Sequence, residues 1–403
     1  MSLPDGFPQI DFLRFHREEL PALLAAGRYR LVAQAAARLG SLALRLPDGA
    51  AWTYRPRQNG VDLVPGDAAA DTVIEMDLDT WQGLVHELEA PAGLFYARRL
   101  RCLRGSAIDL MLWESALRAL YNGRPPHDPV NQTLRDRSGH ALDPHATFTP
   151  TSNREEMAHF LAVAGYLFVR NVFAADEVAA FLGEVRELQR EARPGDKLSW
   201  WGKDASGAEI LCRVTRGVAK PRLGSLPTDA RLHALKDLAD ASLVYRKGEG
   251  QGVTVIFKHP NMSEGLGDLP WHRDCGMGGH GVVCPVLLAS IYLTAATPET
   301  GELAMLPGSH RASMNAHDQS SELSALAAHF SARPGDVSVH FSDTVHAAPP
   351  PSDAHRDSYR ISAVVGFARA GARHHRGEGS YNDVLHQRDD GQIERLETVA
   401  KRA

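Results

Sequence analysis

Two copies of the tripeptide His-Arg-Asp occur in the chain, at residues 272–274 and 355–357, and a His-x-Asp pair can bind a metal ion. With 19 histidines in the chain, the pair alone is weak evidence, so its context decides. The first copy lies between two expected strands. In an extended segment, His272 and Asp274 point to the same side, where both reach one ion. The second copy follows a proline run, and we expect it to be a solvated loop.

A metal site of two histidines and one carboxylate needs another histidine from elsewhere in the chain. Residues 333–349 offer His340 and His346. His346 follows a bend at the expected rim of a sheet, where a ligand can point inward, whereas His340 lies within an expected strand and is expected to pack there. The sequence therefore predicts His272, Asp274 and His346 as the metal ligands and as the catalytic centre.

This ligand set suits iron(II), because it leaves three coordination positions open. The keto acid 2-oxoglutarate can take two of these positions and dioxygen the third. Iron(II), Asp274 and 2-oxoglutarate together carry one net negative charge, which a buried arginine would neutralise. Arg360, in an expected strand, meets this need, since a guanidinium binds a carboxylate through two parallel hydrogen bonds. The alternative is an ordinary surface arginine.

The segment from about 153 to 385 resembles the phytanoyl-CoA dioxygenase family of iron(II)/2-oxoglutarate oxygenases. The likeness is carried by GYLFVRNVFAADEV, PWHRD, IYLTAATPETGELAMLPGSHR, GDVSVHFSDTVH and YRISAVVGF. It implies a double-stranded β-helix, or jelly roll, in which His272, Asp274 and His346 bind iron and Arg360 binds 2-oxoglutarate. Related halogenases replace the carboxylate ligand with a small residue, so the presence of Asp274 favours hydroxylation or another oxidation.

Near the expected cofactor site, one residue departs from the family pattern and two others are further candidates for cofactor contacts. Many family members carry a serine two residues after the second histidine, whereas this chain has Ala348, which affects contacts to 2-oxoglutarate and not the iron ligands. Thr254 and Lys258 are further expected cofactor contacts, and a strand surface that faces solvent is an equal alternative for them.

Residues 20–123 resemble a sterol-carrier-protein type 2 domain. The likeness lies in RLPDGAAWTYRPRQNGVDLVPGDAAADTVIEMDLDTWQGLV and RLRCLRGSAIDLMLWESALRAL. It implies a lipid or acyl-chain binder with an apolar tunnel, and the alternative is a packing or dimerisation module without a cavity.

The pattern of elements divides the chain into three parts. Residues 1–123 open with helical periodicity over 10–40 and continue with short strands and then helices, which predicts a sterol-carrier-like α+β domain. Residues 124–150 hold five prolines and three histidines with little periodicity and are expected to be a linker. Residues 151–403 begin with helices and continue with short strands between Gly/Pro turns, which predicts a mainly β jelly-roll domain with flanking helices.

The composition excludes several classes of protein. The formal net charge is −5, without a basic tail, which argues against nucleic-acid binding. No segment approaches the run of about 20 apolar residues that spans a bilayer, and the N-terminus lacks a signal-peptide core, so we expect a cytoplasmic protein. The four cysteines lack CxxC spacing, which argues against disulfides and a thiolate zinc site.

The sequence thus favours an iron(II)/2-oxoglutarate dioxygenase that uses dioxygen to hydroxylate, or otherwise oxidise, an unactivated C–H bond of a small, apolar or acyl-type substrate. Trp200 and Trp201, between a long helix and the barrel, are candidate substrate-lid residues, or else structural ones. Two alternatives remain. One is a lipid or acyl carrier or binding protein with a catalytically silent jelly roll, and the other is a zinc hydrolase with the same three ligands.

Overall fold

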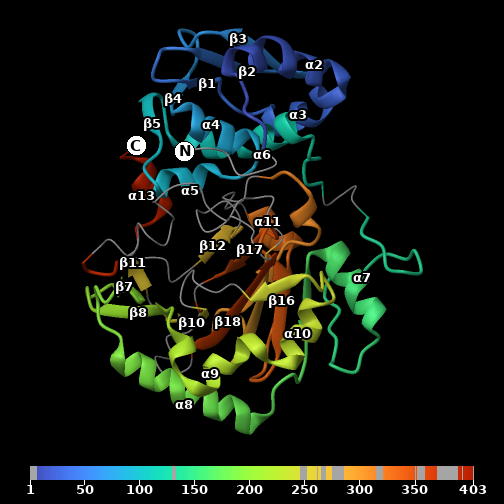
Figure 1. Cartoon of the computed structure of the whole chain (residues 1–403), viewed down its shortest axis with the longest axis vertical. Coiled ribbons are helices and arrows are strands. Elements are labelled where there is room, and N and C mark those ends of the chain that lie inside the picture. Colours follow the sequence, from blue (N-terminus) through green and yellow to red (C-terminus); the bar gives the residue numbers. More distant parts are fainter. Residues whose placement is uncertain are drawn as a thin grey trace.

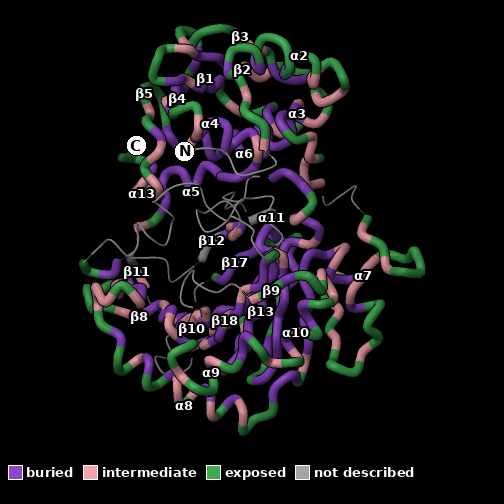
Figure 2. The backbone as a smooth tube through the Cα atoms, in the orientation of Figure 1, coloured by how far each residue is buried: buried purple, intermediate pink, exposed green. Residues whose placement is uncertain are grey.

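The computed structural model describes most of the chain. The described residues are 7–128, 133–245, 252–260, 262–264, 269–274, 286–314, 321–349, 351, 359–369, 389–392 and 394–402. Figure 1 shows an N-terminal part, drawn at the top in blue and cyan, above a larger part that holds most of the strands. Buried residues gather in the middle of each part, so each part has a core of its own (Figure 2).

The N-terminal part is an α+β unit built on a five-stranded sheet of order β3-β2-β1-β4-β5. Its strands are β1 Leu42–Arg45, β2 Ala51–Arg57, β3 Gly60–Pro65, β4 Thr72–Glu75 and β5 Arg101–Arg104. Its main helices are α3 Tyr29–Ala36, α4 Leu78–Val85, α5 Pro91–Tyr96 and α6 Ile108–Asn122. Helix α6 ends at Gly123, whose φ of 67° lies in the left-handed region that glycine favours.

The helical pattern over residues 10–40 does not form one continuous helix. The segment is divided into α1 Phe12–Arg14, α2 Leu20–Leu23 and α3, with wider π-helical turns between them. Gly27, inside the π-helical turn Leu24–Arg28, has a φ of 113°, which no regular helix contains, so the segment is kinked there, just before α3. Periodicity alone therefore located the apolar face and missed the breaks.

Aromatic side chains fill the N-terminal core around a buried histidine. Trp52, Trp81 and Trp113 of this core are all buried. His16 donates from Nδ1 to the carbonyl oxygen of Phe12 at 2.7 Å, which leaves Nε2 to accept from the Tyr54 hydroxyl at 2.5 Å. Burial lowers the pKa of His16 to about 4, so the ring is neutral at pH 7. The sterol-carrier-like function of this domain stays a prediction.

The C-terminal part is a sheet-rich core with flanking helices, as the sequence predicts. Its large sheet has nine strands in the described residues, with β9 beside β18 and the others in the order β11-β7-β8-β10-β18-β13-β16-β6, and its small sheet has the order β12-β17-β14-β15. The large sheet contains β6 Tyr166–Val169, β7 Ser199–Asp204, β8 Glu209–Val214, β9 Leu243–Tyr245, β10 Val253–Lys258, β11 Met262–Glu264, β13 Leu287–Tyr292, β16 Val337–Phe341 and β18 Arg360–Arg369. The small sheet contains β12 Leu269–His272, β14 Leu303–Met305, β15 Ala328–Phe330 and β17 His346–Ala348.

Helices cover one face of the large sheet. They are α8 Ala175–Glu191, α9 Pro221–Ser225 and α10 Ala230–Lys236, and in Figure 1 α8 and α9 lie along the bottom of this part, whereas α7 Arg154–Ala164 lies at its side and contacts β6. Helix α7 is capped by Asn153, whose side chain accepts hydrogen bonds from the backbone N–H groups of Glu155 and Glu156. Apolar residues of α8, α9 and α10 share one buried core with the odd-numbered residues of β10 and β18.

The opposite face of the large sheet carries buried polar side chains among apolar ones, and we call it the polar face. Directly paired residues of neighbouring strands point to the same face. The pairs on this face include Lys258 with Arg360, Tyr292 with Ser362, and Ser290 with Ser338. A buried polar surface needs partners, so this face is where a polar ligand would fit best.

The two parts of the chain are joined at more than one place. The expected linker contacts the C-terminal part through single strand-like bridges, Pro126 with Ser313 and Phe148 with Val169. The short helix α13, Leu396–Ala400, returns to the N-terminal part, where Leu396 and Ala400 join its core. The division into domains at residues 123 and 150 stays a prediction.

Within the described residues, the helices are too short or too polar for any of them to traverse a lipid bilayer.

Replacing Gly165 with alanine should destabilise the protein. Gly165 ends α7 with a φ of 91°, and a Cβ there would overlap His310 and Thr344. We expect Gly165→Ala to lower the free energy of unfolding by about 2–4 kcal/mol, measured by chemical denaturation. The control is Gly183→Ala within α8, where a Cβ meets open space; it should raise stability by about 0.5–1 kcal/mol. Equal effects of the two changes would contradict this account.

The buried His16 should make the protein less stable in acid. In the unfolded chain His16 has the ordinary pKa of 6.5 and takes up a proton as the pH falls, whereas folded His16 stays neutral down to about pH 4. Stability therefore falls from about pH 6.5 to pH 4, by about 2 kcal/mol at pH 5. Unfolding of the wild type and of His16→Gln at pH 7 and pH 5 tests this, and the variant should lose less stability between the two. His310, whose pKa burial also lowers to about 4, is present in both proteins.

Candidate metal centre

The pairing of β12 with β17 places two histidines face to face. In this antiparallel pair, His272 lies directly opposite His346, and their rings are 4.2 Å apart between centroids. The neighbours Trp271, Val345 and Ala347 pack into a separate apolar cluster. Since side chains alternate along a strand, the burial of these apolar neighbours turns both imidazoles to the other face.

Asp274 completes the cluster just beyond the end of β12. Its backbone N–H donates to the carbonyl oxygen of Ser342 at 2.9 Å, which ties it to the segment that precedes His346. One carboxylate oxygen lies 3.8 Å from Nε2 of His272, and the other lies 3.8 Å from Nε2 of His346. One ligand atom from each residue lies within 4.8 Å of the other two, which is close enough for all three to bind one metal ion. The structure thus brings together the three residues that the sequence predicted as ligands.

The protonation states suit metal binding. Burial lowers the pKa of His346 well below its usual value, and His272 and His340 lower it further, so its ring is neutral at pH 7. Nδ1 of His346 lies 2.9 Å from the carbonyl oxygen of Thr344 and must donate to it, which leaves the lone pair on Nε2 for a metal. Burial raises the pKa of Asp274, but the surrounding imidazoles of His340, His346 and His272 outweigh burial and keep its pKa below the usual value.

His340 lies closer to this cluster than the sequence indicated. It is buried within β16, as expected, and its ring is 4.6 Å from that of His346. Its Nε2 lies 3.7 Å from a carboxylate oxygen of Asp274, and neither ring nitrogen has a hydrogen-bond partner in the described part of the chain. His340 is therefore placed to support Asp274 from the large sheet, while the metal-ligand cluster itself consists of the other three residues.

Arg360 is a buried guanidinium on the polar face of the large sheet. Burial lowers its pKa from the usual value, and its Nε has no hydrogen-bond partner among the described residues. Lys258 pairs with Arg360 across β10 and β18 and is also buried, whereas Thr254, on the same face of β10, is half-buried. For Lys258 the solvent-facing alternative is therefore wrong. This face offers a site for an anion.

The two tryptophans of the predicted lid lie in β7, a strand paired with β8. Trp200 pairs with Arg213, whose guanidinium lies 4.0 Å from the centre of the Trp200 ring. The register shifts between Trp200 and Trp201, and Trp201 packs against the hydrophobic core of the C-terminal part. Because β7 is hydrogen-bonded to β8, these residues do not lie on a hinged loop. Contact of either residue with substrate stays a prediction. The second His-Arg-Asp copy, residues 355–357, lies outside the described residues.

Sequence reasoning missed two buried charges beside the ligands. Arg273 stands between His272 and Asp274, and alternation turns its side chain away from them. Asp343, three residues before His346, lies 3.3 Å from the Arg273 guanidinium. The only sign of the Arg273–Asp343 contact in the sequence is the position of a charged residue, Arg273, between two predicted ligands.

The C-terminal part of the chain matches a known family. Residues 161–358 match the phytanoyl-CoA dioxygenase (PhyH) family, and this segment includes all three cluster residues and ends two residues before Arg360. The match and the His-Asp-His cluster thus fall on the same segment of the chain.

Among individual proteins, the chain is similar to the ectoine dioxygenase of Bordetella parapertussis. The two are 29% identical over 151 residues, which is 36% of this chain and 46% of that protein. The ectoine dioxygenase of Bordetella bronchiseptica is also 29% identical, over 150 residues. The chain thus spans less than half the length of the curated relatives that it matches.

The solved structures to which the chain is similar are more distant in sequence. AviO1 from Streptomyces viridochromogenes is 23% identical, with 56% of this chain and 99% of that chain covered and a TM-score of 0.44. The epimerase SnoN in complex with Fe3+, alpha ketoglutarate and nogalamycin RO is 21% identical, with 55% and 86% covered and a TM-score of 0.45. EctD from S. alaskensis with 2-oxoglutarate and 5-hydroxyectoine is 20% identical, with 62% and 88% covered and a TM-score of 0.43.

Replacing each of the two neighbouring histidines should separate a ligand from a supporting residue. We expect His346→Ala to weaken binding of Co(II), used as a probe for iron(II), by more than about 100-fold, beyond what loss of a supporting residue causes. His340→Ala should weaken it by no more than about tenfold. Anaerobic titration followed by calorimetry measures both. A stronger effect of His340→Ala would make His340 the third ligand.

Proposed function

We propose that this protein is an iron(II)/2-oxoglutarate-dependent dioxygenase that hydroxylates, or otherwise oxidises, an unactivated C–H bond of a small, apolar or acyl-type organic molecule. The observation that carries the proposal is the cluster of His272, Asp274 and His346, whose ligand atoms lie within 4.8 Å of one another. The match of residues 161–358 to the PhyH family supports it.

The residues present fit both cofactors. Iron(II) binds to sets of two imidazoles and one carboxylate, and such a set leaves coordination positions open for other ligands. The 2-oxoglutarate would be held by Arg360, because a buried guanidinium without a carboxylate partner in the described residues is costly unless an anion joins it. Lys258, buried opposite Arg360, adds a second positive charge on the same face.

Bound iron(II) and 2-oxoglutarate supply an oxidant from dioxygen, with the keto acid converted to succinate and carbon dioxide. The contribution of the protein lies in its own residues. Thr344 fixes the tautomer of His346, and the neighbouring imidazoles keep Asp274 ionised. Arg360 would orient the keto acid through its far carboxylate, and the two sheets would exclude water from the reacting C–H bond.

Two other functions remain as outcomes of the test. A lipid or acyl carrier with a silent jelly roll would bind neither iron nor 2-oxoglutarate in a productive way. A zinc hydrolase would bind metal through the same three residues but leave 2-oxoglutarate unchanged. The charged Arg360 on the polar face has no evident use in either alternative, which favours the oxygenase.

The test is anaerobic addition of iron(II) and 2-oxoglutarate, followed by air. A visible charge-transfer band and then succinate release support the oxygenase, whereas a colourless mixture with unchanged 2-oxoglutarate overturns it. Apolar acids and their thioesters are then screened for stimulation of succinate release, which identifies the substrate class.

Substitution of Arg360 should separate 2-oxoglutarate binding from metal binding. We expect Arg360→Met to weaken 2-oxoglutarate binding by about 10–100-fold, because a charged hydrogen bond contributes about 1.5–3 kcal/mol. Arg360→Lys should recover part of the loss, since lysine keeps the charge but not the paired hydrogen bonds. Titration of the charge-transfer band with 2-oxoglutarate measures both, and Co(II) affinity should stay within about threefold. Unchanged 2-oxoglutarate affinity in Arg360→Met would remove this residue from the site.

A further inference from the structure

A group of charged side chains is buried between the N-terminal part and the segments that carry the candidate metal ligands. We call it the interdomain charge cluster, and its members are Glu87, Glu114, Arg118, Arg124, Arg273 and Asp343. All are buried except Arg124, which is half-buried. The first three belong to the N-terminal part, and Arg124 follows directly after it. The last two lie close in sequence to the candidate metal ligands. Buried charges are costly unless they are paired, so this arrangement is under strong constraint.

Asp343 lies at the centre of the cluster, because three guanidinium groups converge on its carboxylate. Nη2 of Arg118 lies 3.1 Å from it, and Nη1 of Arg124 lies 3.4 Å from it. From the other side, Nη1 of Arg273 lies 3.3 Å from the same carboxylate. One carboxylate thus joins two arginines of the N-terminal part to an arginine of the ligand-bearing segment.

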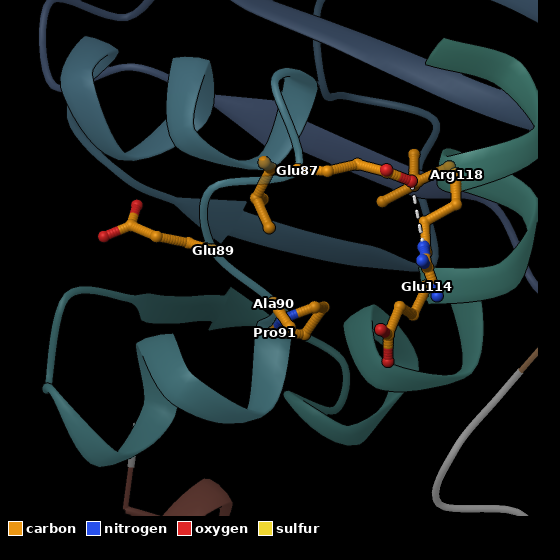
Figure 3. Close-up of a pocket in the computed structure, with 8 residues that line it drawn as sticks. Glu87, Glu89, Ala90, Pro91, Glu114 and Arg118 are labelled. Carbon is orange, nitrogen blue, oxygen red and sulfur yellow. Dashed lines mark hydrogen bonds and ion pairs between the residues drawn. The ribbon is translucent and has the colours of Figure 1, made fainter. Parts of the chain in front are cut away.

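Glu87 holds the two N-terminal arginines in place. It accepts from Nε of Arg118 at 2.9 Å and from Nε of Arg124 at 2.8 Å. Figure 3 shows the Glu87 side chain directed at Arg118, which projects from α6 together with Glu114. Glu87 has a φ of 53°, in the left-handed region that a residue with a Cβ rarely adopts. A strained backbone at a buried glutamate indicates that these contacts hold it there.

A small cavity adjoins these side chains. It has a volume of about 20 Å³ and is lined by Glu87, Glu114 and Arg118 among others (Figure 3). Nη1 of Arg118 and Oε1 of Glu114 have no hydrogen-bond partner within the described ranges. A space of this size holds about one water molecule, which would satisfy both atoms. The cavity therefore belongs to the charge cluster and is too small for an organic ligand.

The cluster reaches the metal ligands through very short stretches of chain. Arg273 is flanked by His272 and Asp274, and its Nη2 also donates to the carbonyl oxygen of Met314 at 2.7 Å. Asp343 follows Ser342, whose carbonyl oxygen accepts from the backbone of Asp274 at 2.9 Å. Any shift of Asp343 or Arg273 thus moves the segments on which the ligands stand.

We propose that Arg118, from helix α6 of the N-terminal part, is a positioning residue of the metal site, acting through Asp343 on the two segments that carry His272, Asp274 and His346. The inference rests on the proposed function only in that these residues bind the metal. The N-terminal part is then a structural component of the metal centre, whatever ligand it binds itself.

The test compares the full-length wild type with Arg118→Met, which keeps the length of the side chain and removes its charge. Anaerobic titration with Co(II) should show about tenfold weaker binding in the variant, at the lower end of the loss seen when groups that orient metal ligands are removed. The visible absorption spectrum of bound Co(II), which reports ligand geometry, should also change. Arg118→Lys, which keeps the charge but not the two-sided contact, should give a smaller loss of about threefold.

The control is Arg99→Met. Arg99 also belongs to the N-terminal part, but it pairs with Glu89 and Asp79 instead. Both methionine variants should melt at lower temperature than the wild type, and only Arg118→Met should change Co(II) affinity and spectrum. If Arg118→Met does not fold, Arg118→Lys carries the comparison with Arg99→Met.

The outcomes separate this inference from the proposed function. A wild type that binds no Co(II) overturns the proposed metal centre itself. If the wild type binds and the Arg118 variants keep its affinity and spectrum, the positioning role is overturned. The same is true if Arg99→Met weakens binding as much as Arg118→Met, because the loss would then reflect general destabilisation of the N-terminal part.

Discussion

The pairing of two short strands, β12 and β17, is the constraint on which the candidate metal centre depends. The register sets His272 opposite His346, and a shift by one residue would turn one of them into the apolar cluster behind the small sheet. The burial of Trp271 and Ala347 in that cluster is what fixes the register. The geometry of a polar site is thus specified by apolar packing on the far side of the same strands.

The large sheet contributes the second half of the site, because its two faces have different roles. The face under α8, α9 and α10 is apolar and supplies most of the hydrophobic burial of the C-terminal part. That stability allows the other face to hold buried polar groups without a partner in the described residues, such as Nε of Arg360, which cost free energy in the absence of a ligand. A ligand that forms hydrogen bonds with these groups therefore binds more tightly, because binding relieves the free-energy penalty of their burial.

The sequence predicted those parts of the structure that depend on local pattern. The alternation in residues 272–274 and the bend before His346 were sufficient to select three residues whose ligand atoms the structure places within 4.8 Å of one another. The contacts of Arg273 with Asp343, and of Asp343 with Arg118, join residues more than 60 positions apart, and no periodicity encodes such pairing. The interrupted helix at residues 12–36 was missed because an apolar face continues across its breaks.

The return of α13 to the N-terminal part affects the order in which the chain acquires structure. Leu396 and Ala400 belong to a core otherwise built from residues before 122, and the carbonyl oxygen of Glu394 accepts a hydrogen bond from the Tyr96 hydroxyl at 3.0 Å. During synthesis on the ribosome, the N-terminal core therefore keeps an exposed apolar edge until α13 has been synthesised and can pack against it. Chaperones that shield exposed apolar surface can bind this edge in the meantime.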